Sequence, residues 1–293
     1  MSLTAGIHTI PLAEYLADPA PEPSLSHSLA HLLLTKSPAH AWTASPRLNP
    51  HYQREDDTKF DIGSAAHAVL LEGDYKRLAV VNAKDYRTKE AQATRDESRA
   101  AGMIPVLTEK MVEIEDMVTV AKAGINQSEL ADAFIMGKPE QTLIWQKRGV
   151  WLRSRPDWLT LDYKRLIDYK TTAGSAEPNA WARGPMIAQG YDLQAAMGLS
   201  GLNRLIGEDT RTFTFVVQEV EPPYAVSFVG MSPHYLEFSH RRLTRAMTDW
   251  GACVLNKNWP TYSTRIAYMD LPPWLETREE EQVWVQAEKE NWK

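Results

Sequence analysis

Two aspartates and a lysine are the side chains whose spacing first suggests chemistry. Asp168 and Lys170 stand two positions apart in a run rich in β-branched, aromatic and leucine residues, and Asp157 precedes them. The segment 151–172 is typical of an antiparallel hairpin that turns at the polar residues 162–165. Because residues two apart on a strand point to one face, Asp168 and Lys170 should lie together. We expect Asp157, on the first strand, to join them.

Carboxylates that converge in this way repel each other unless a cation lies between them. Mg²⁺ fits such a place, because it prefers oxygen ligands and commonly takes one or two carboxylates together with phosphate oxygens of a substrate. A neighbouring lysine could then position a water molecule or stabilise charge on a phosphoryl group. An ordinary surface hairpin with an Asp-Lys pair is the alternative, so further residues must decide.

A histidine in an apolar stretch is one such residue. The residues from Phe60 to Leu71 have the spacing of a buried helix, in which Gly63 allows close approach and His67 lies one turn later on the same face. A lone histidine in such a helix is commonly a core residue. With aspartates nearby it becomes a candidate metal ligand, although neutral imidazole is an unusual ligand for Mg²⁺. Both interpretations stay open.

Together these motifs resemble the signature of the PD-(D/E)xK nucleases. Pro156-Asp157 followed by Asp168-Tyr169-Lys170 resembles the central motif, with aspartate where glutamate is commoner. The pairs Gly63/His67 and Gly137/Glu140 resemble the helix and strand motifs of the RecB-like branch, and all of them occur in the expected order. The combination is most similar to the lambda exonuclease and RecE group, over residues 7–255.

This resemblance implies a fold and a set of roles. The expected fold is α/β, a restriction-endonuclease-like core with a mixed central sheet flanked by helices. By resemblance, the metal site would hold two Mg²⁺ ions, with Mn²⁺ able to replace them. Its expected ligands are His67, Asp157, Asp168 and the carbonyl group of Tyr169. The expected catalytic residues are Asp157, Asp168, Lys170, Glu140 and Gln194.

The resemblance also suggests residues that contact DNA. A serine-capped helix after residue 24 could receive a 5′ phosphate at its N-terminus, although capping alone also explains these serines. Gln194 resembles the glutamine of a "Q-x-x-x-Y" helix, but the tyrosine position is occupied by Gly198, so Tyr191 is a substitute candidate. The residues expected to bind DNA are Ser26, Ser28, Lys36, Arg153, Arg155, Tyr191 and Gln194.

The implied activity is that of a Mg²⁺-dependent exonuclease on linear double-stranded DNA. It would degrade the 5′-ended strand to mononucleotides and leave a 3′ overhang for a single-strand annealing protein. A RecB-like nuclease that acts on single-stranded ends is an alternative. A non-catalytic DNA-binding protein on the same fold is another, and it is disfavoured because Asp157, Asp168 and Lys170 are all present.

Composition limits the class of protein. With 293 residues, 43% hydrophobic and 24% charged, the chain can form a large core. The single cysteine excludes an internal disulfide and a cysteine-ligated cluster. Neither a signal peptide nor a membrane-spanning apolar run is evident, so a cytoplasmic protein with no membrane partner is expected.

Charge is distributed unevenly along the chain. The net charge is −6, yet residues 147–170 contain seven basic and three acidic side chains. Such a protein has a weak overall hold on DNA. A closed ring of identical subunits would keep it on the duplex. The lambda exonuclease and RecE group forms such rings, and we expect a trimer in preference to a tetramer.

The domain organisation is expected to follow from this. We expect a nuclease domain at 1–258 with an N-terminal helical arm, and a tail at 259–293 that contacts a neighbouring subunit.

Local patterns predict the elements around the hairpin. Apolar periodicity and capping residues indicate helices, while β-branched runs on either side of Pro222-Pro223 indicate a second hairpin. The main predictions are helices at 12–16, 29–37, 58–72, 88–101, 108–123, 175–189 and 233–257, strands at 77–81, 140–145 and 149–161, and a hairpin over 212–231.

Overall fold

The computed structural model describes residues 2–53, 61–208 and 211–291. It contains two compact units, residues 1–260 and residues 261–293. The smaller unit carries helix α11 (Pro273–Asn291), on which Trp274 and Trp284 are exposed. Residues 58–60 of the predicted helix and Trp292 of the tail lie outside the described residues. No helix in the described part of the chain is long and apolar enough to cross a membrane.

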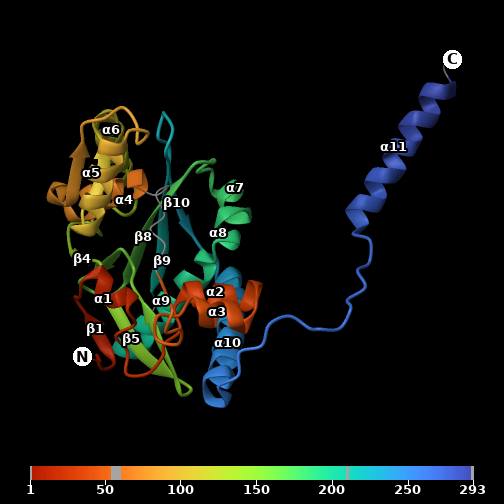
Figure 1. Ribbon diagram of the computed structural model, residues 1–293, viewed down its shortest axis with the longest axis horizontal. Helices are drawn as coiled ribbons and strands as arrows, with labels where there is room; N and C mark the ends of the chain where they lie inside the picture. The colour runs from red at the N-terminus through yellow and green to blue at the C-terminus, as the bar shows by residue number, and fades with distance from the viewer. Residues whose placement is uncertain (1, 54–60, 209–210, 292–293) are drawn as a thin grey trace. The chain divides into compact units, whose positions relative to one another are not determined.

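A mixed five-stranded sheet forms the centre of the larger unit (Figure 1). Strands β8 and β9 pair in parallel, and the other neighbours pair antiparallel. The predicted 212–231 hairpin is confirmed as β9 and β10. The strand order is β10 (Val226–Gly230), β9 (Thr212–Glu219), β8 (Arg165–Thr172), β7 (Trp158–Thr160) and β4 (Gly137–Pro139).

A second, three-stranded sheet continues from one end of the first. It contains β1 (Gly6–His8), β5 (Thr142–Lys147) and β6 (Val150–Ser154), in the order β1-β5-β6. The chain therefore passes from one sheet to the other between β4 and β5, and passes back between β6 and β7. The predictions of continuous strands over 140–145 and 149–161 are wrong at these two crossings.

The two crossings lie next to each other and contain predicted site residues. Glu140 has a left-handed backbone with φ 58° between β4 and β5. Asp157 lies in the bend between β6 and β7, and not on a strand as expected. The Glu140 N–H donates to the Asp157 carbonyl at 2.9 Å, which joins the two bends. Pro156, which has no N–H to give to a sheet, marks the end of β6 pairing.

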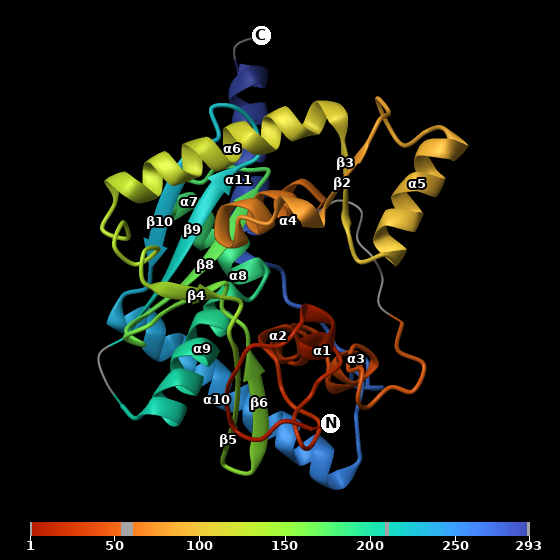
Figure 2. The same ribbon diagram turned by 90° about the vertical axis from the view of Figure 1, so that its left-hand side faces the viewer.

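Helices cover both faces of the central sheet, as the resemblance predicted. On one face α2 (His27–Thr35), α9 (Tyr191–Ile206) and α10 (Pro233–Asn256) contact one another. On the other face lie α4 (Asp61–His67) and α6 (Thr108–Gln127), as Figure 2 shows. Alternation along β8 matches this arrangement, because Leu166 enters the core beneath α9 while Ile167 and Tyr169 enter the core beneath α4 and α6.

The remaining elements are short or peripheral. A parallel pair, β2 and β3, is connected by the helix α5. The predictions for α1, α2, α5, α6 and α10 are confirmed to within a few residues. The other bounds are α1 (Leu12–Leu16), α3 (Pro38–Thr43), the π-helix Ala68–Glu72, the 3-10 helix Tyr75–Arg77, β2 (Leu78–Val81), α5 (Lys89–Ala100), β3 (Ile104–Leu107), α7 (Pro178–Arg183) and α8 (Pro185–Ala188).

Candidate active site

Asp168 and Lys170 leave the same face of β8, as their spacing predicted. Asp168 is fully buried, and Lys170 forms an ion pair with it. Helix α9 supplies the next contacts. Gln194 Nε2 donates to Asp168 Oδ2 at 2.5 Å, and Lys170 Nζ lies 4.8 Å from the centre of the Tyr191 ring. The strand and the first turn of the helix thus form one polar cluster.

Asp157 joins this cluster from the bend before β7. Its Oδ2 accepts the Tyr169 backbone N–H at 2.7 Å, so the carboxylate is tied to β8 between Asp168 and Lys170. His67 Nε2 lies 3.1 Å from Asp157 Oδ1 and 3.3 Å from Glu140 Oε1. The structure therefore brings together His67, Glu140, Asp157, Asp168, Lys170 and Gln194.

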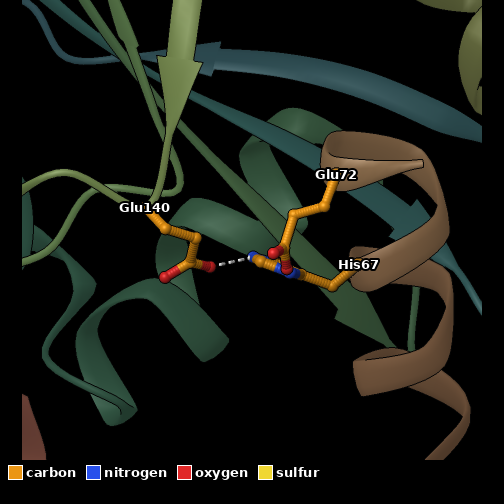
Figure 3. Close-up of side chains that lie close together, drawn as sticks. All are labelled: His67, Glu72 and Glu140. Atoms are coloured by element: carbon orange, nitrogen blue, oxygen red, sulfur yellow. Dashed lines mark ion pairs between the residues drawn. The ribbon is translucent and has the colours of Figure 1, made fainter. Parts of the chain in front are cut away.

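A glycine sets the position of His67. A Cβ atom on Gly63 would lie 2.6 Å from Thr171 Oγ1, so a larger residue there would require the Thr171 side chain to move. His67 is four residues later, at the end of α4, where the helix continues as a π-helix. That wider turn brings Glu72 back toward His67. Figure 3 shows Glu72 and Glu140 approaching the imidazole, and one ligand atom from each of the three residues lies within 4.8 Å of the others.

The cluster favours positive charge at His67. Burial disfavours the imidazolium form, but the Asp157 carboxylate, with help from Glu140, raises the pKa of His67 to about 9. Burial likewise opposes ionisation of Asp157, yet its pKa is lowered, because His67, Lys170 and the Tyr169 N–H all stabilise the carboxylate. The oxygens of Asp157 and Glu140 therefore create a place where a cation is favourable.

Asp168 and Glu140 are less easily ionised. Burial and the nearby Asp157 charge raise the pKa of Asp168 to about 7, and the same two causes raise the pKa of Glu140. Burial would lower the pKa of Lys170, but the Asp168 and Asp157 carboxylates outweigh it, so the pKa of Lys170 is raised above its usual range. The lysine is therefore an ammonium group that donates hydrogen bonds.

The donor set fits a divalent cation. Glu72 and Glu140 form one group with His67, and Asp157 contacts the same imidazole. Carboxylate oxygens are the ligands that Mg²⁺ and Mn²⁺ prefer. In the described part of the chain, the buried Gln194 Oε1 also has no hydrogen-bond partner, which leaves an amide oxygen at the same place. His67 Nε2 could serve as a nitrogen ligand only after the loss of the proton that Asp157 and Glu140 stabilise. The assignment of His67, Asp157, Asp168 and the Tyr169 carbonyl as ligands, and the count of two ions, stay predictions.

Arg153 differs most from its predicted role. Its guanidinium is buried, lies 3.1 Å from Asp18 Oδ2, and donates to the carbonyl and the hydroxyl of Ser24 at 2.7 Å. It is therefore not placed to meet a DNA backbone, and it anchors the N-terminal arm to β6. Periodicity could not reveal this, because the arm that covers Arg153 is distant in sequence.

Arg155 also points inward. It forms an ion pair with Glu140 through Nε, and its Nη1 donates to the Ile10 carbonyl at 2.8 Å and to Thr142 Oγ1 at 3.0 Å. The side chain is only 9% exposed. Glu140 is thus held between Arg155 and His67. We interpret Arg155 as a residue that orients Glu140, in place of the DNA contact expected from the sequence.

Replacing Arg155 by lysine tests this interpretation. A lysine cannot hold Glu140 and also donate to Ile10 and Thr142, so hydrolysis should fall by roughly tenfold. The matched control is Arg165→Lys, because Arg165 also pairs with a carboxylate, donating to Asp132 at 2.5 and 2.8 Å, but in a more exposed position. Initial rates of DNA degradation compare the two. Equal rates would remove Arg155 from the site.

The serine-capped helix starts close to the cluster. Ser26 is buried and its Oγ accepts the Leu29 N–H at 3.4 Å, so the predicted cap is confirmed. Ser28 is exposed, and Lys36 is exposed at the opposite end of α2. Contacts of Ser26, Ser28 and Lys36 with a phosphate stay predictions.

Two residues near the cluster were not predicted. Burial and the charge of Lys170 lower the pKa of His27 to about 3, so His27 is a neutral group beside the lysine. The sequence could have indicated His27 as a site residue, because it lies between the candidate residues Ser26 and Ser28. It could not have indicated Glu72, because Glu72 follows His67 by five residues, and residues five apart do not share a face of an ordinary α-helix.

Comparison with known protein families identifies the family of this chain. Residues 26–272 match the model of a family described as a PDDEXK-like domain of unknown function (DUF3799). The chain belongs to this family. The resemblance to PD-(D/E)xK nucleases is thereby confirmed at the level of the superfamily, and so is the restriction-endonuclease-like fold. The family description does not single out the lambda exonuclease and RecE group.

Solved structures add support for the fold of this PDDEXK-like domain. A proposed exonuclease from Eubacterium rectale aligns with a TM-score of 0.57 at 12% identity, covering 90% of this chain and 97% of that one. A second structure, SSO0001, aligns with a TM-score of 0.26 at 12% identity, covering 67% of this chain and 88% of that one, which is too weak to support an argument. No curated protein sequence matched the chain.

Proposed function

We propose that this PDDEXK-like protein is a metal-dependent exonuclease that degrades the 5′-ended strand of linear double-stranded DNA. The observation that carries the proposal is that Asp157, in the bend before β7, lies beside Asp168 and Lys170 of β8. His67, at the end of α4, and Glu140, between β4 and β5, contact the same group. Buried titratable groups with shifted pKa values that gather in this way are typical of functional sites.

Two further findings support a nuclease. The family is PDDEXK-like, and the solved structure with the same fold is named as a proposed exonuclease. The 5′ polarity, the release of mononucleotides and the 3′ overhang for an annealing protein come from the resemblance to the lambda exonuclease and RecE group. The subunit ring belongs to the same proposal.

Each residue has a distinct part in the proposed reaction. A divalent cation held by Asp157 and Asp168 would polarise the scissile phosphodiester and promote attack by water. The Lys170 ammonium is fixed beside Asp168, and its remaining N–H donors can stabilise negative charge on the phosphoryl oxygens. Gln194 orients Asp168 through one hydrogen bond, and Arg155 orients Glu140.

Labelled DNA tests the proposal. The purified protein is mixed with linear duplex carrying a label at either the 5′ or the 3′ end of one strand, with Mg²⁺, with Mn²⁺ or with EDTA. We expect the 5′ label to appear first as a mononucleotide, and the 3′-labelled strand to shorten gradually, in either metal but not in EDTA. Covalently closed circular duplex of the same sequence should survive.

Other outcomes would select the alternatives. First release of the 3′ label would reverse the polarity, and cleavage of the closed circle would indicate an endonuclease. Faster loss of single-stranded than of duplex substrate would favour the RecB-like alternative. Binding of DNA without cleavage in either metal would leave a non-catalytic protein on this fold.

A further inference from the structure

One turn of α9 contacts both members of the Asp168/Lys170 pair. Gln194 contacts Asp168, and Tyr191, three residues earlier, contacts Lys170. Three residues advance about 4.5 Å along a helix axis, and two residues advance about 6.6 Å along a strand. The difference of about 2 Å is within the reach of glutamine and tyrosine side chains, so one helical turn can contact two alternate residues of the facing strand. Gln194 has a counterpart in the family motif, but Tyr191 stands outside it.

The Tyr191 ring is itself held in place by other aromatic rings. It stacks on Trp181 with ring centres 5.7 Å apart and an angle of 14°, and it lies 6.1 Å from Phe215 at 40°. Trp181 is 1% exposed and Phe215 is fully buried. A ring packed against two buried aromatic side chains has little freedom to move, so it offers a rigid surface to the lysine.

Lys170 needs such a surface. A lysine side chain is long and flexible, and its ammonium group can rotate away from any single partner. The Asp168 ion pair restrains it on one side, while the Tyr191 ring, whose face attracts cations, lies on another. The two contacts together define where the ammonium group can meet a phosphoryl oxygen.

We propose that Tyr191 is a positioning residue for Lys170, and that the face of its ring, not its hydroxyl group, does this. The inference deepens the proposed nuclease function and rests on it for its effect on catalysis. It also replaces the expectation that Tyr191 serves mainly as a DNA contact, in which case the hydroxyl group and substrate affinity would matter most.

Two substitutions at Tyr191 separate these roles. Tyr191→Leu removes the ring, and kcat should fall by about tenfold, the loss expected for a partly buried cation–π contact, while KM changes by less than about twofold. Tyr191→Phe keeps the ring and should retain most of kcat. Tyr191→Met serves if the leucine variant does not fold. The control is Phe238→Leu, because Phe238 also faces a cation, Arg242 at 5.8 Å, but lies outside the cluster.

A second measurement does not depend on activity. Reductive methylation followed by mass spectrometry reports how accessible and mobile the Lys170 amine is. Methylation of Lys170 should be several-fold faster in Tyr191→Leu than in wild type or Tyr191→Phe. If wild type does not degrade DNA but this pattern appears, the proposed function fails and the positioning role stands. The inference would be overturned if Lys170 were methylated at the wild-type rate in Tyr191→Leu. A raised KM with unchanged kcat in Tyr191→Phe would overturn it as well.

Discussion

Replacing Asp168 by asparagine is expected to lower the rate of phosphodiester hydrolysis by about a thousandfold or more. Asparagine has nearly the same shape and can still accept the Gln194 hydrogen bond, so the fold should be kept. It lacks the negative charge that attracts a cation and holds the Lys170 ammonium. Single-turnover hydrolysis measures the rate, and calorimetric titration should show weaker Mg²⁺ binding.

Comparison variants make this prediction specific. Lys170→Ala should lose a similar amount of activity but keep its Mg²⁺ affinity, because it removes no carboxylate. Asp162→Asn is the matched control, since Asp162 lies in the turn of the same hairpin, where it accepts from Thr160 Oγ1 at 2.6 Å and from the Lys164 N–H at 3.0 Å. It should hydrolyse DNA at nearly the wild-type rate. An Asp168→Asn variant as active as this control would exclude Asp168 from the active site.

The second large effect concerns stability. Arg242 on α10 forms an ion pair with Asp192, which is fully buried in the first turn of α9. Asp192 Oδ1 has no hydrogen-bond partner in the described part of the chain, so the carboxylate depends on this arginine. Arg242→Met should therefore lower the free energy of unfolding by about 3–5 kcal/mol, because it leaves a buried charge unpaired. Denaturant unfolding measures the change.

The neighbouring arginine supplies the control. Arg241 forms an exposed pair with Glu237 one helical turn away, and Arg241→Met should change the free energy of unfolding by less than about 1 kcal/mol. The double variant Asp192→Leu with Arg242→Met should regain much of the lost stability, since an apolar pair leaves no unpaired charge. If Arg242→Met were as stable as Arg241→Met, the buried carboxylate would have another source of stabilisation.

Much of this fold follows from local patterns in the chain. Alternation along β8 places Asp168 and Lys170 on one face, and this needs only the two-residue period of a strand. Serine capping at Ser26 and the apolar spacing of α6 and α10 are equally local. The restriction-endonuclease-like fold was predicted by the resemblance of the ordered motifs to the PD-(D/E)xK nucleases, and not by local periodicity.

Other features depend on contacts between distant segments. Glu140 and Asp157 lie in bends because two chain segments pass from one sheet to the other. Pro156 indicates where β6 ends, but no local pattern shows that the next strand belongs to a different sheet. Arg153 and Arg155 look like exposed basic residues in the sequence. Both are turned inward by partners in the N-terminal arm, Asp18 and Ile10.

Residue spacing was enough to show which neighbouring groups share a face, because a strand period and a helical turn are properties of a few neighbouring residues. Only the folded structure shows which groups from distant segments meet, and where the helix after His67 widens. Glu72 comes beside His67 because the helix widens into a π-turn. Tyr191 reaches Lys170 because α9 packs across β8. The contact between Tyr191 and Lys170 depends on how whole elements fill the core, and a short stretch of sequence does not specify that packing.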